Sequence, residues 1–132
     1  MALLIGGRRG NAVVEFALVL PILLALVFGI TEFGRAWMTV NVMSTAAREG
    51  ARLAVVTAPD VAAVRARVTQ VLTAARITAT TINVTGPAPA DVMRRVTVTV
   101  NANFTVFSGR VIGPFRGTIP LSATATMRHE SL

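Results

Sequence analysis

A long, nearly uninterrupted apolar run near the N-terminus constrains this chain more than any other feature. Residues 12–30 read AVVEFALVLPILLALVFGI and contain a single charged residue, Glu15. A membrane-spanning helix needs about 20 mainly apolar residues, and these 19 residues meet that requirement. Only 14% of the 132 residues are charged, whereas 53% are hydrophobic. Since ordinary soluble domains carry roughly 25% charged residues, we expect residues 12–30 to span a membrane.

The helical pattern continues past this span. Phe33, Trp37 and Ala47 follow one another at near-helical spacing, and Pro59 disfavours helix at the residue before it. With Asn11 as a candidate cap, the sequence predicts one helix over residues 11–57, roughly 70 Å long at 1.5 Å per residue. A proline inside a helix removes one backbone hydrogen bond, so we expect a kink near Pro21.

A secretory signal peptide is the main alternative for the apolar run. Such a peptide has an apolar stretch of about 7–15 residues followed by a small-residue cleavage site. Here the run is longer, and the chain continues as TEFGRAWMTV without such a site. We therefore favour a membrane anchor over a signal peptide.

The remainder of the chain predicts a second helix and a sheet. Asp60 is a good N-cap for an amphipathic helix over 60–76, with an apolar stripe. Alternation of apolar and polar residues then predicts strands over 95–107 and 118–128, and more weakly over 77–85.

Pro120 indicates that the segment 118–128 is an edge strand or that a strand starts there. The expected fold class is α+β and membrane-anchored. It comprises a long N-terminal transmembrane helix, a short second helix and a small antiparallel sheet of about three strands.

Composition argues against several chemistries. The chain has no cysteine and a single histidine, His129, so we expect no catalytic residues, no metal site and no cofactor, and we do not expect an enzyme. The net charge is +7, but the arginines are spread from Arg8 to Arg128 without a dense cluster. We therefore do not expect nucleic-acid binding or a small-molecule substrate.

Charged and aromatic residues beyond the span have local interpretations. Glu32 and Arg35 are three residues apart and are expected to pair at the membrane boundary. Glu49 is expected to pair with its helical neighbours Arg48 and Arg52. The position of Trp37 fits either an interfacial anchor or a packed core residue.

Glu15 is the most informative residue. A charged side chain at the centre of a membrane helix costs about 2.5–3.5 kcal/mol on insertion scales, and such residues usually have a partner. Glu15 is only four residues from Asn11, so its carboxylate can also reach the lipid headgroups. From the residues alone, both interpretations stay open.

The residues around Glu15 carry a resemblance to a known family. Gly-Arg-Arg-Gly is followed by Asn-Ala-Val-Val-Glu-Phe and then by the apolar helix. This order resembles the class III signal sequence of type IV pilins and pseudopilins. In that family, a prepilin peptidase cuts after the glycine and the fifth mature residue is glutamate. A cut between Gly10 and Asn11 makes Glu15 the fifth residue, and Phe16 stands where Flp-type pilins often have tyrosine.

Residues 10–37, with AAREGARLA at 46–54, narrow the resemblance to the TadE-like family, the minor pseudopilins of the tight-adherence (Tad, type IVc) pilus system. The segment ATATMRHE at 123–130 also resembles the last strand of that family. The resemblance implies partners of three kinds: a prepilin peptidase, other pilin or pseudopilin subunits, and the Tad assembly machinery. It further implies that Glu15 and Phe16 take part in subunit assembly and that Glu15 pairs with a neighbour's N-terminus.

On this interpretation the chain has three parts. Residues 1–10 form a leader, residues 11–57 form the long helix, and residues 58–132 form a small extracytoplasmic α+β domain. The resemblance places the N-terminus in the bacterial cytoplasm, with a single pass through the cytoplasmic membrane, and it allows incorporation into the pilus. An uncleaved, signal-anchored module that displays a binding or adhesion domain remains the alternative.

Overall fold

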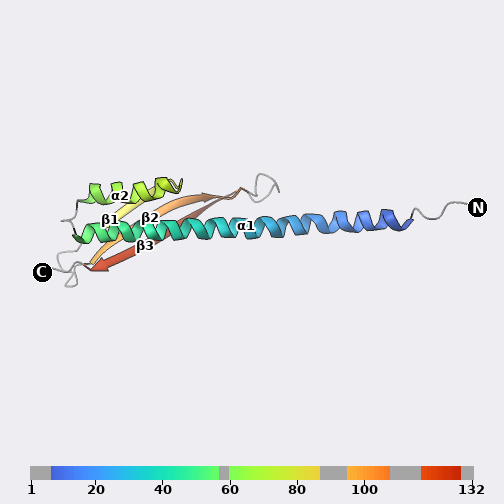
Figure 1. The fold of residues 1–132 in the computed structure, drawn as a ribbon, viewed down its shortest axis with the longest axis horizontal. Coiled ribbons are helices and arrows are strands. Elements are labelled where there is room, and N and C mark those ends of the chain that lie inside the picture. Colours follow the sequence, from blue (N-terminus) through green and yellow to red (C-terminus); the bar gives the residue numbers. More distant parts are fainter. Residues whose placement is uncertain (1–6, 57–59, 87–94, 108–116, 129–132) are drawn as a thin grey trace, which may run out of the picture.

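The computed structural model describes residues 7–56, 60–86, 95–107 and 117–128. In chain order these residues form two helices and three strands, α1 to β3. Figure 1 shows that α2 and the sheet lie beside the C-terminal half of α1, while the N-terminal half of α1 extends away from them. The expected α+β class, with a long apolar N-terminal helix, a short second helix and a three-stranded antiparallel sheet, is confirmed.

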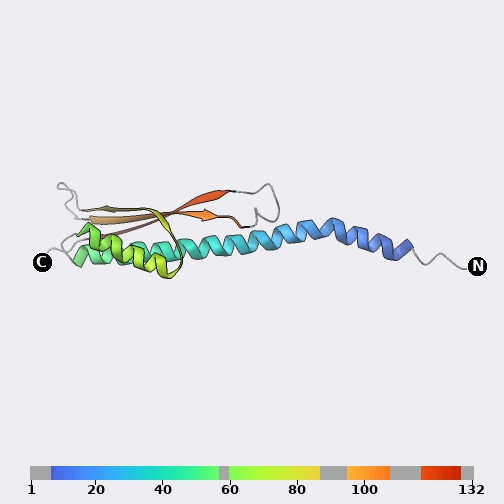
Figure 2. The same cartoon turned by 90° about the horizontal axis from the view of Figure 1, so that it is seen from above.

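Helix α1 is a single helix over Gly7–Val56, and at 1.5 Å per residue its 50 residues are about 75 Å long. Figure 2 shows that α1 bends in its N-terminal part, and Pro21 lies in that part, as expected of an internal proline. The expectation that Asn11 caps the helix is wrong for this chain, because the helix begins at Gly7. Pro59, the expected terminator, lies outside the described residues.

Helix α2 (Val61–Ala74) begins and ends with well-formed caps. The carboxylate of Asp60 accepts hydrogen bonds from the backbone N–H groups of Ala62 and Ala63, as predicted for this N-cap. At the other end, the N–H of Ile77 donates to the carbonyl of Leu72, and Arg76 takes a left-handed conformation with φ of 57°. This is a Schellman ending in which arginine occupies the position that glycine usually takes.

The sheet has the order β1-β2-β3, with both pairs antiparallel. Its strands are β1 (Ala79–Thr85), β2 (Arg95–Thr105) and β3 (Thr118–Arg128). Strand β3 is at an edge, as Pro120 predicted, and Asn103 pairs with Pro120 in the register. On the outer face, hydroxyl pairs from facing threonines add cross-strand hydrogen bonds, such as Thr99 with Thr124 at 3.1 Å.

The core lies between the C-terminal half of α1, one face of α2 and the inner face of the sheet. Apart from Met43, its fully buried members have small or branched apolar side chains, because the two helices and the sheet approach closely. They are Met43, Ala46, Ala47, Ala51, Ala54, Val64, Val68, Leu72, Val96, Val98 and Val100. Gly50 marks the closest approach, since a Cβ atom there would lie 2.5 Å from Cγ2 of Val68.

The ion pairs differ in part from the sequence-based expectation. Glu32 and Arg35 pair at 2.8 Å, as predicted. Glu49 instead pairs with Arg67 of α2 at 3.6 Å, and Arg48 donates to the backbone carbonyl of Ser44. The predicted local pairing of Glu49 within α1 is therefore wrong, because α2 packs against this part of α1 and brings a cation from outside the helix.

Candidate functional site: the exposed N-terminal half of α1

The carboxylate of Glu15 lies on the surface of α1. It accepts a hydrogen bond from the side-chain amide of Asn11, with 3.2 Å between Nδ2 and Oε1. The two residues are one helical turn apart, so the bond is local to α1. Among the side chains that the structure describes on α1, which begin at Asn11, no cation pairs with Glu15.

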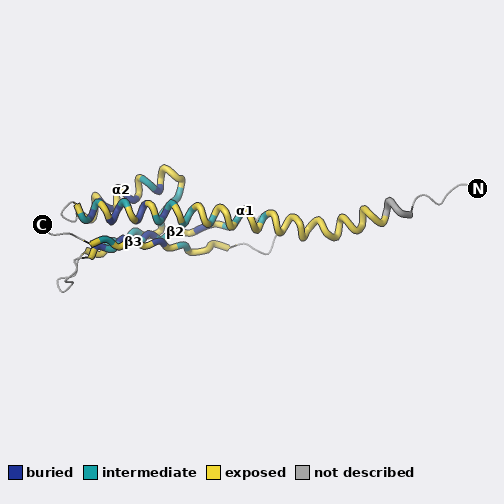
Figure 3. The backbone as a smooth tube through the Cα atoms, turned by 60° about the horizontal axis from the view of Figure 1, so that its bottom comes forward, coloured by how far each residue is buried: buried dark blue, intermediate teal, exposed yellow. Residues whose placement is uncertain are grey.

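The apolar side chains around Glu15 have no packing partner in this chain. Phe16 is 60% exposed and Leu18 is 70% exposed. From Asn11 onward, Figure 3 shows the N-terminal half of α1 as mostly exposed, in contrast with the buried residues gathered further along the helix. Among the described residues, α1 is the one helix long and apolar enough to cross a membrane. An apolar helix surface of this size requires lipid or another apolar partner.

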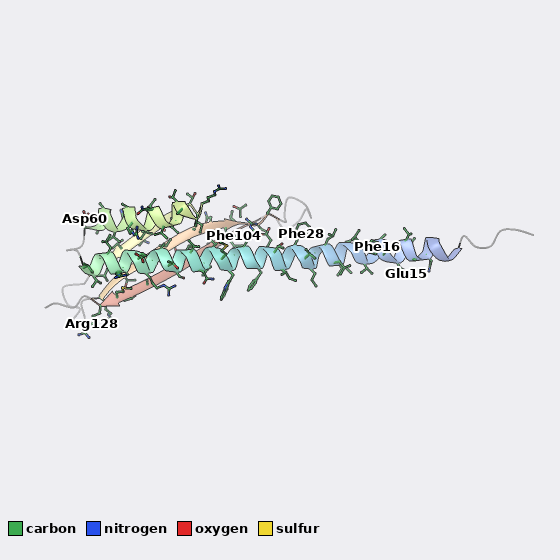
Figure 4. The ribbon with its side chains drawn as sticks, in the orientation of Figure 1. Glu15, Phe16, Phe28, Asp60, Phe104 and Arg128 are labelled. Atoms are coloured by element: carbon green, nitrogen blue, oxygen red, sulfur yellow. The ribbon has the colours of Figure 1, made fainter. Side chains whose placement is uncertain are left out.

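Figure 4 shows Glu15 and Phe16 near the N-terminal end of α1, distant from the packed part of the molecule. Gly10 and Asn11 also lie within α1, so the predicted cleavage site falls in the first turns of a continuous helix. Cleavage there would leave Asn11 as the first residue and Glu15 one turn into the helix. Residues 1–6 of the predicted leader lie outside the described residues.

A second polar arrangement joins α1 to the end of β2, and the sequence did not predict it. Oε1 of Glu32 accepts a hydrogen bond from the backbone N–H of Phe107 at 2.7 Å, while Oε2 pairs with Arg35. The guanidinium of Arg35 also lies 5.2 Å from the ring centre of Phe104, a cation–π geometry. Glu32 and Phe107 are 75 residues apart, a separation across which local sequence patterns carry no signal.

Trp37 stacks on Phe33, with 6.3 Å between the ring centres. Trp37 is 62% exposed, so it is not a packed core residue of this chain. The packed-core interpretation is therefore wrong, and the interfacial position stays a prediction.

Other chemistry is sparse in the described part of the chain. No three His, Cys, Asp or Glu residues gather there into a group that could hold a metal ion. An open groove of about 420 Å³ lies between α1, the turn after α2 and β2, with Arg35, Arg76 and Phe104 among its lining residues. His129, the single histidine, lies outside the described residues.

Comparison with known families addresses this N-terminal region. Residues 10–52 match the profile of the family described as TadE-like protein. This segment is TadE-like. The match begins at Gly10, includes Asn11, Glu15 and Phe16, and extends through most of α1. The predicted family resemblance is thus confirmed over this range, whereas the resemblance noted at 123–130 lies outside the matched residues.

A search of curated proteins and a search of solved structures gave no match. The TadE-like segment therefore supplies the family evidence for this chain, and α2 and the sheet are interpreted from their own geometry. The matched segment contains both the exposed apolar half of α1 and most of the half that packs in the core.

Proposed function

We propose that this chain is a minor pseudopilin that takes part in assembling or priming a Tad (type IVc) pilus. The TadE-like match and the long apolar helix indicate a Tad-pilus-associated protein with a single-pass membrane anchor. The observation that carries the finer proposal is the position of Glu15: a carboxylate on an exposed apolar helix, five residues after Gly10.

In this proposal, a prepilin peptidase removes residues 1–10, and the helix from Asn11 anchors the mature chain in the cytoplasmic membrane. Cleavage creates an α-amino group at Asn11, which has an ordinary pKa of about 7.7–8.0 and is therefore largely charged at neutral pH. The N-terminus faces the cytoplasm, and α2 and the sheet lie on the extracytoplasmic side. The chain is a substrate of an enzyme and not itself an enzyme.

The carboxylate of Glu15 and the new α-amino group of a neighbouring subunit are natural partners. Both lie near the same membrane depth, because Asn11 is one helical turn from Glu15. A charge in an apolar medium is stabilised by an opposite charge at short range. Satisfying Glu15 only on assembly therefore favours one register between neighbouring helices. The intact leader opposes this pairing, because residue 11 then has no free amine.

The experiment is substitution of Glu15 in cells that make the rest of the pilus system. We expect Glu15→Ala and Glu15→Gln to insert in the membrane at the normal level and to be lost from the sheared pilus fraction and from subunit crosslinks. Glu15→Gln keeps an acceptor for Asn11 but lacks the charge, so it isolates the ionic contribution. Leu18→Met, an apolar exchange on the same segment, is the matched control and should assemble normally.

Normal recovery of Glu15→Ala in the pilus fraction, together with normal crosslinking, would show that the carboxylate has no role in assembly. If Glu15→Gln assembles and Glu15→Ala does not, hydrogen bonding, and not charge, is the property that matters. Either result would overturn the proposed ion pair.

A further inference from the structure

The end of β2 lies next to the point where α1 leaves the apolar span, because Phe107 contacts Glu32 there. Figures 1 and 2 show β2 running along α1 towards its N-terminal half. The backbone N–H of Phe107 donates to Glu32 at 2.7 Å, and Glu32 is two residues past the predicted end of the span at residue 30. At 1.5 Å per residue, this places Glu32 about 3 Å beyond the hydrocarbon edge.

The headgroup region on each side of a bilayer is about 5–8 Å thick, the difference between a core of about 30 Å and a total of about 40–45 Å. Phe107 is held to Glu32 by a direct hydrogen bond. Its backbone therefore lies within one side-chain length of the level of Glu32 along the membrane normal. Phe107 is 55% exposed. A large apolar side chain is thus exposed close to the level of the headgroups.

The chemistry of Glu32 fits this location. A carboxylate near a low-dielectric layer needs partners for its oxygens. One oxygen of Glu32 pairs with Arg35 and the other accepts from Phe107, and the Glu32 side chain is only 14% exposed. The same contacts that satisfy the carboxylate hold the end of β2 against the membrane-side part of α1.

We propose that Phe107, at the end of β2, makes a second membrane contact, called here the hairpin contact, in which its side chain enters the boundary between headgroups and acyl chains of the leaflet from which α1 emerges. Large apolar side chains, phenylalanine among them, insert at this boundary where a protein segment lies against a membrane. With α1 as the first attachment and Phe107 as the second, tilting of the packed region relative to the membrane is restricted before any subunit assembles. The proposal rests on the proposed insertion of residues 12–30.

The test uses tryptophan fluorescence of the full chain in phosphatidylcholine–phosphatidylglycerol vesicles that contain lipids brominated at shallow or deep acyl positions. The native tryptophan is replaced by Trp37→Phe, and single tryptophans are then introduced as Phe107→Trp, Leu23→Trp and Val56→Trp. Val56 is 79% exposed at the far end of α1, about 39 Å past residue 30 by helix rise, and is the matched distal control.

We expect the tryptophan of Phe107→Trp to lose roughly half of its emission with shallow brominated lipids, as a side chain at the interface should, and to respond less to deep ones. Leu23→Trp should respond most to deep ones, and Val56→Trp to neither. If Phe107→Trp behaves like Val56→Trp while Leu23→Trp is quenched, the hairpin contact is overturned and the span stands. If Leu23→Trp is not quenched either, the proposed span fails and the hairpin contact fails with it.

A second measurement covers the case in which Phe107→Trp fails to fold. The chain contains no cysteine, so Phe107→Cys carries a nitroxide label as the only thiol. Greater accessibility of this label to oxygen than to a water-soluble nickel chelate supports membrane contact. The reverse order, matching a label at Val56→Cys, overturns it and assigns the exposed face of Phe107 to water or to another subunit.

Discussion

The two halves of α1 are parts of one continuous helix with opposite surroundings. The N-terminal half has large apolar residues that are mostly exposed, such as Leu18 and Ile22, whereas the C-terminal half buries alanine and glycine against α2 and the sheet. Small residues permit close approach of helix and strand backbones, while large ones provide apolar area for lipid or another helix. Both halves of α1 contain apolar side chains, and they differ in the size of those side chains. The half with small ones packs within this chain, and the half with large ones requires a partner outside it.

The largest effect is expected when a leucine of the packed region is truncated and the result is compared with truncation of a leucine on the exposed half of α1. Leu72 of α2 is 1% exposed in the core that the C-terminal half of α1 shares, whereas Leu23 on the N-terminal half is 48% exposed. We expect Leu72→Ala to lower the free energy of unfolding of the packed region by about 2–5 kcal/mol, from lost burial and a residual cavity. Leu23→Ala should leave it unchanged. Chemical denaturation in detergent micelles, followed by the circular dichroism of the sheet, measures the free energy of unfolding of both variants. Equal losses would show that the exposed and the packed leucine do not differ in their contribution.

Two glycines of α1, one in each environment, test the same difference between the packed and the exposed part. A Cβ atom at Gly50 would meet Val68 at 2.5 Å, whereas one at Gly34 meets nothing within 4 Å. We expect Gly50→Ala to destabilise the packed region by about 1–3 kcal/mol through overpacking. Gly34→Ala should be neutral or slightly stabilising, since alanine favours helix. The same denaturation experiment compares them, and a stabilised Gly50→Ala variant would contradict the close approach of α1 and α2.

The smallest effect concerns Arg76 at the end of α2. Its left-handed backbone, with φ of 57°, costs a non-glycine residue roughly 1–2 kcal/mol. Glycine avoids this cost, but its greater conformational freedom in the unfolded chain offsets part of the stabilisation. We therefore expect Arg76→Gly to stabilise the packed region by about 0.5–1 kcal/mol and Arg76→Val to destabilise it. The two midpoints of denaturation should lie on opposite sides of the native value, and a shift of both in one direction would argue against this cap geometry.

The sequence predicted the regular elements well because each has a strong local period. Strand β3 occurs at 118–128 as predicted, and strand β2 ends two residues before the predicted boundary. The cap at Asp60 was also predictable, because its partners are two and three residues away. In each case the determining interaction is close in the sequence or repeats along it.

The contacts that could not be predicted join distant parts of the chain. Glu49 pairs with Arg67 in α2 and not within its own helix, and Glu32 reaches the backbone of Phe107. These contacts depend on how the layers dock, which periodicity does not specify. In the candidate site, Glu15 could be singled out from the sequence as the single charged residue of the apolar run. Asn11, which donates to it, was wrongly predicted to cap the helix, because the helix continues back to Gly7.

In the proposed pseudopilin, the functional form of α1 begins at Asn11, and the mass of the chain recovered from membranes tests this start most directly. Membranes from cells with an active prepilin peptidase should yield a chain that starts at Asn11, and cells without that peptidase should retain the leader. Gly10→Val, which alters the predicted cleavage site, should retain the leader in both. A chain that keeps residues 1–10 in the presence of active peptidase would contradict the pseudopilin account and favour an uncleaved anchor that displays a binding domain.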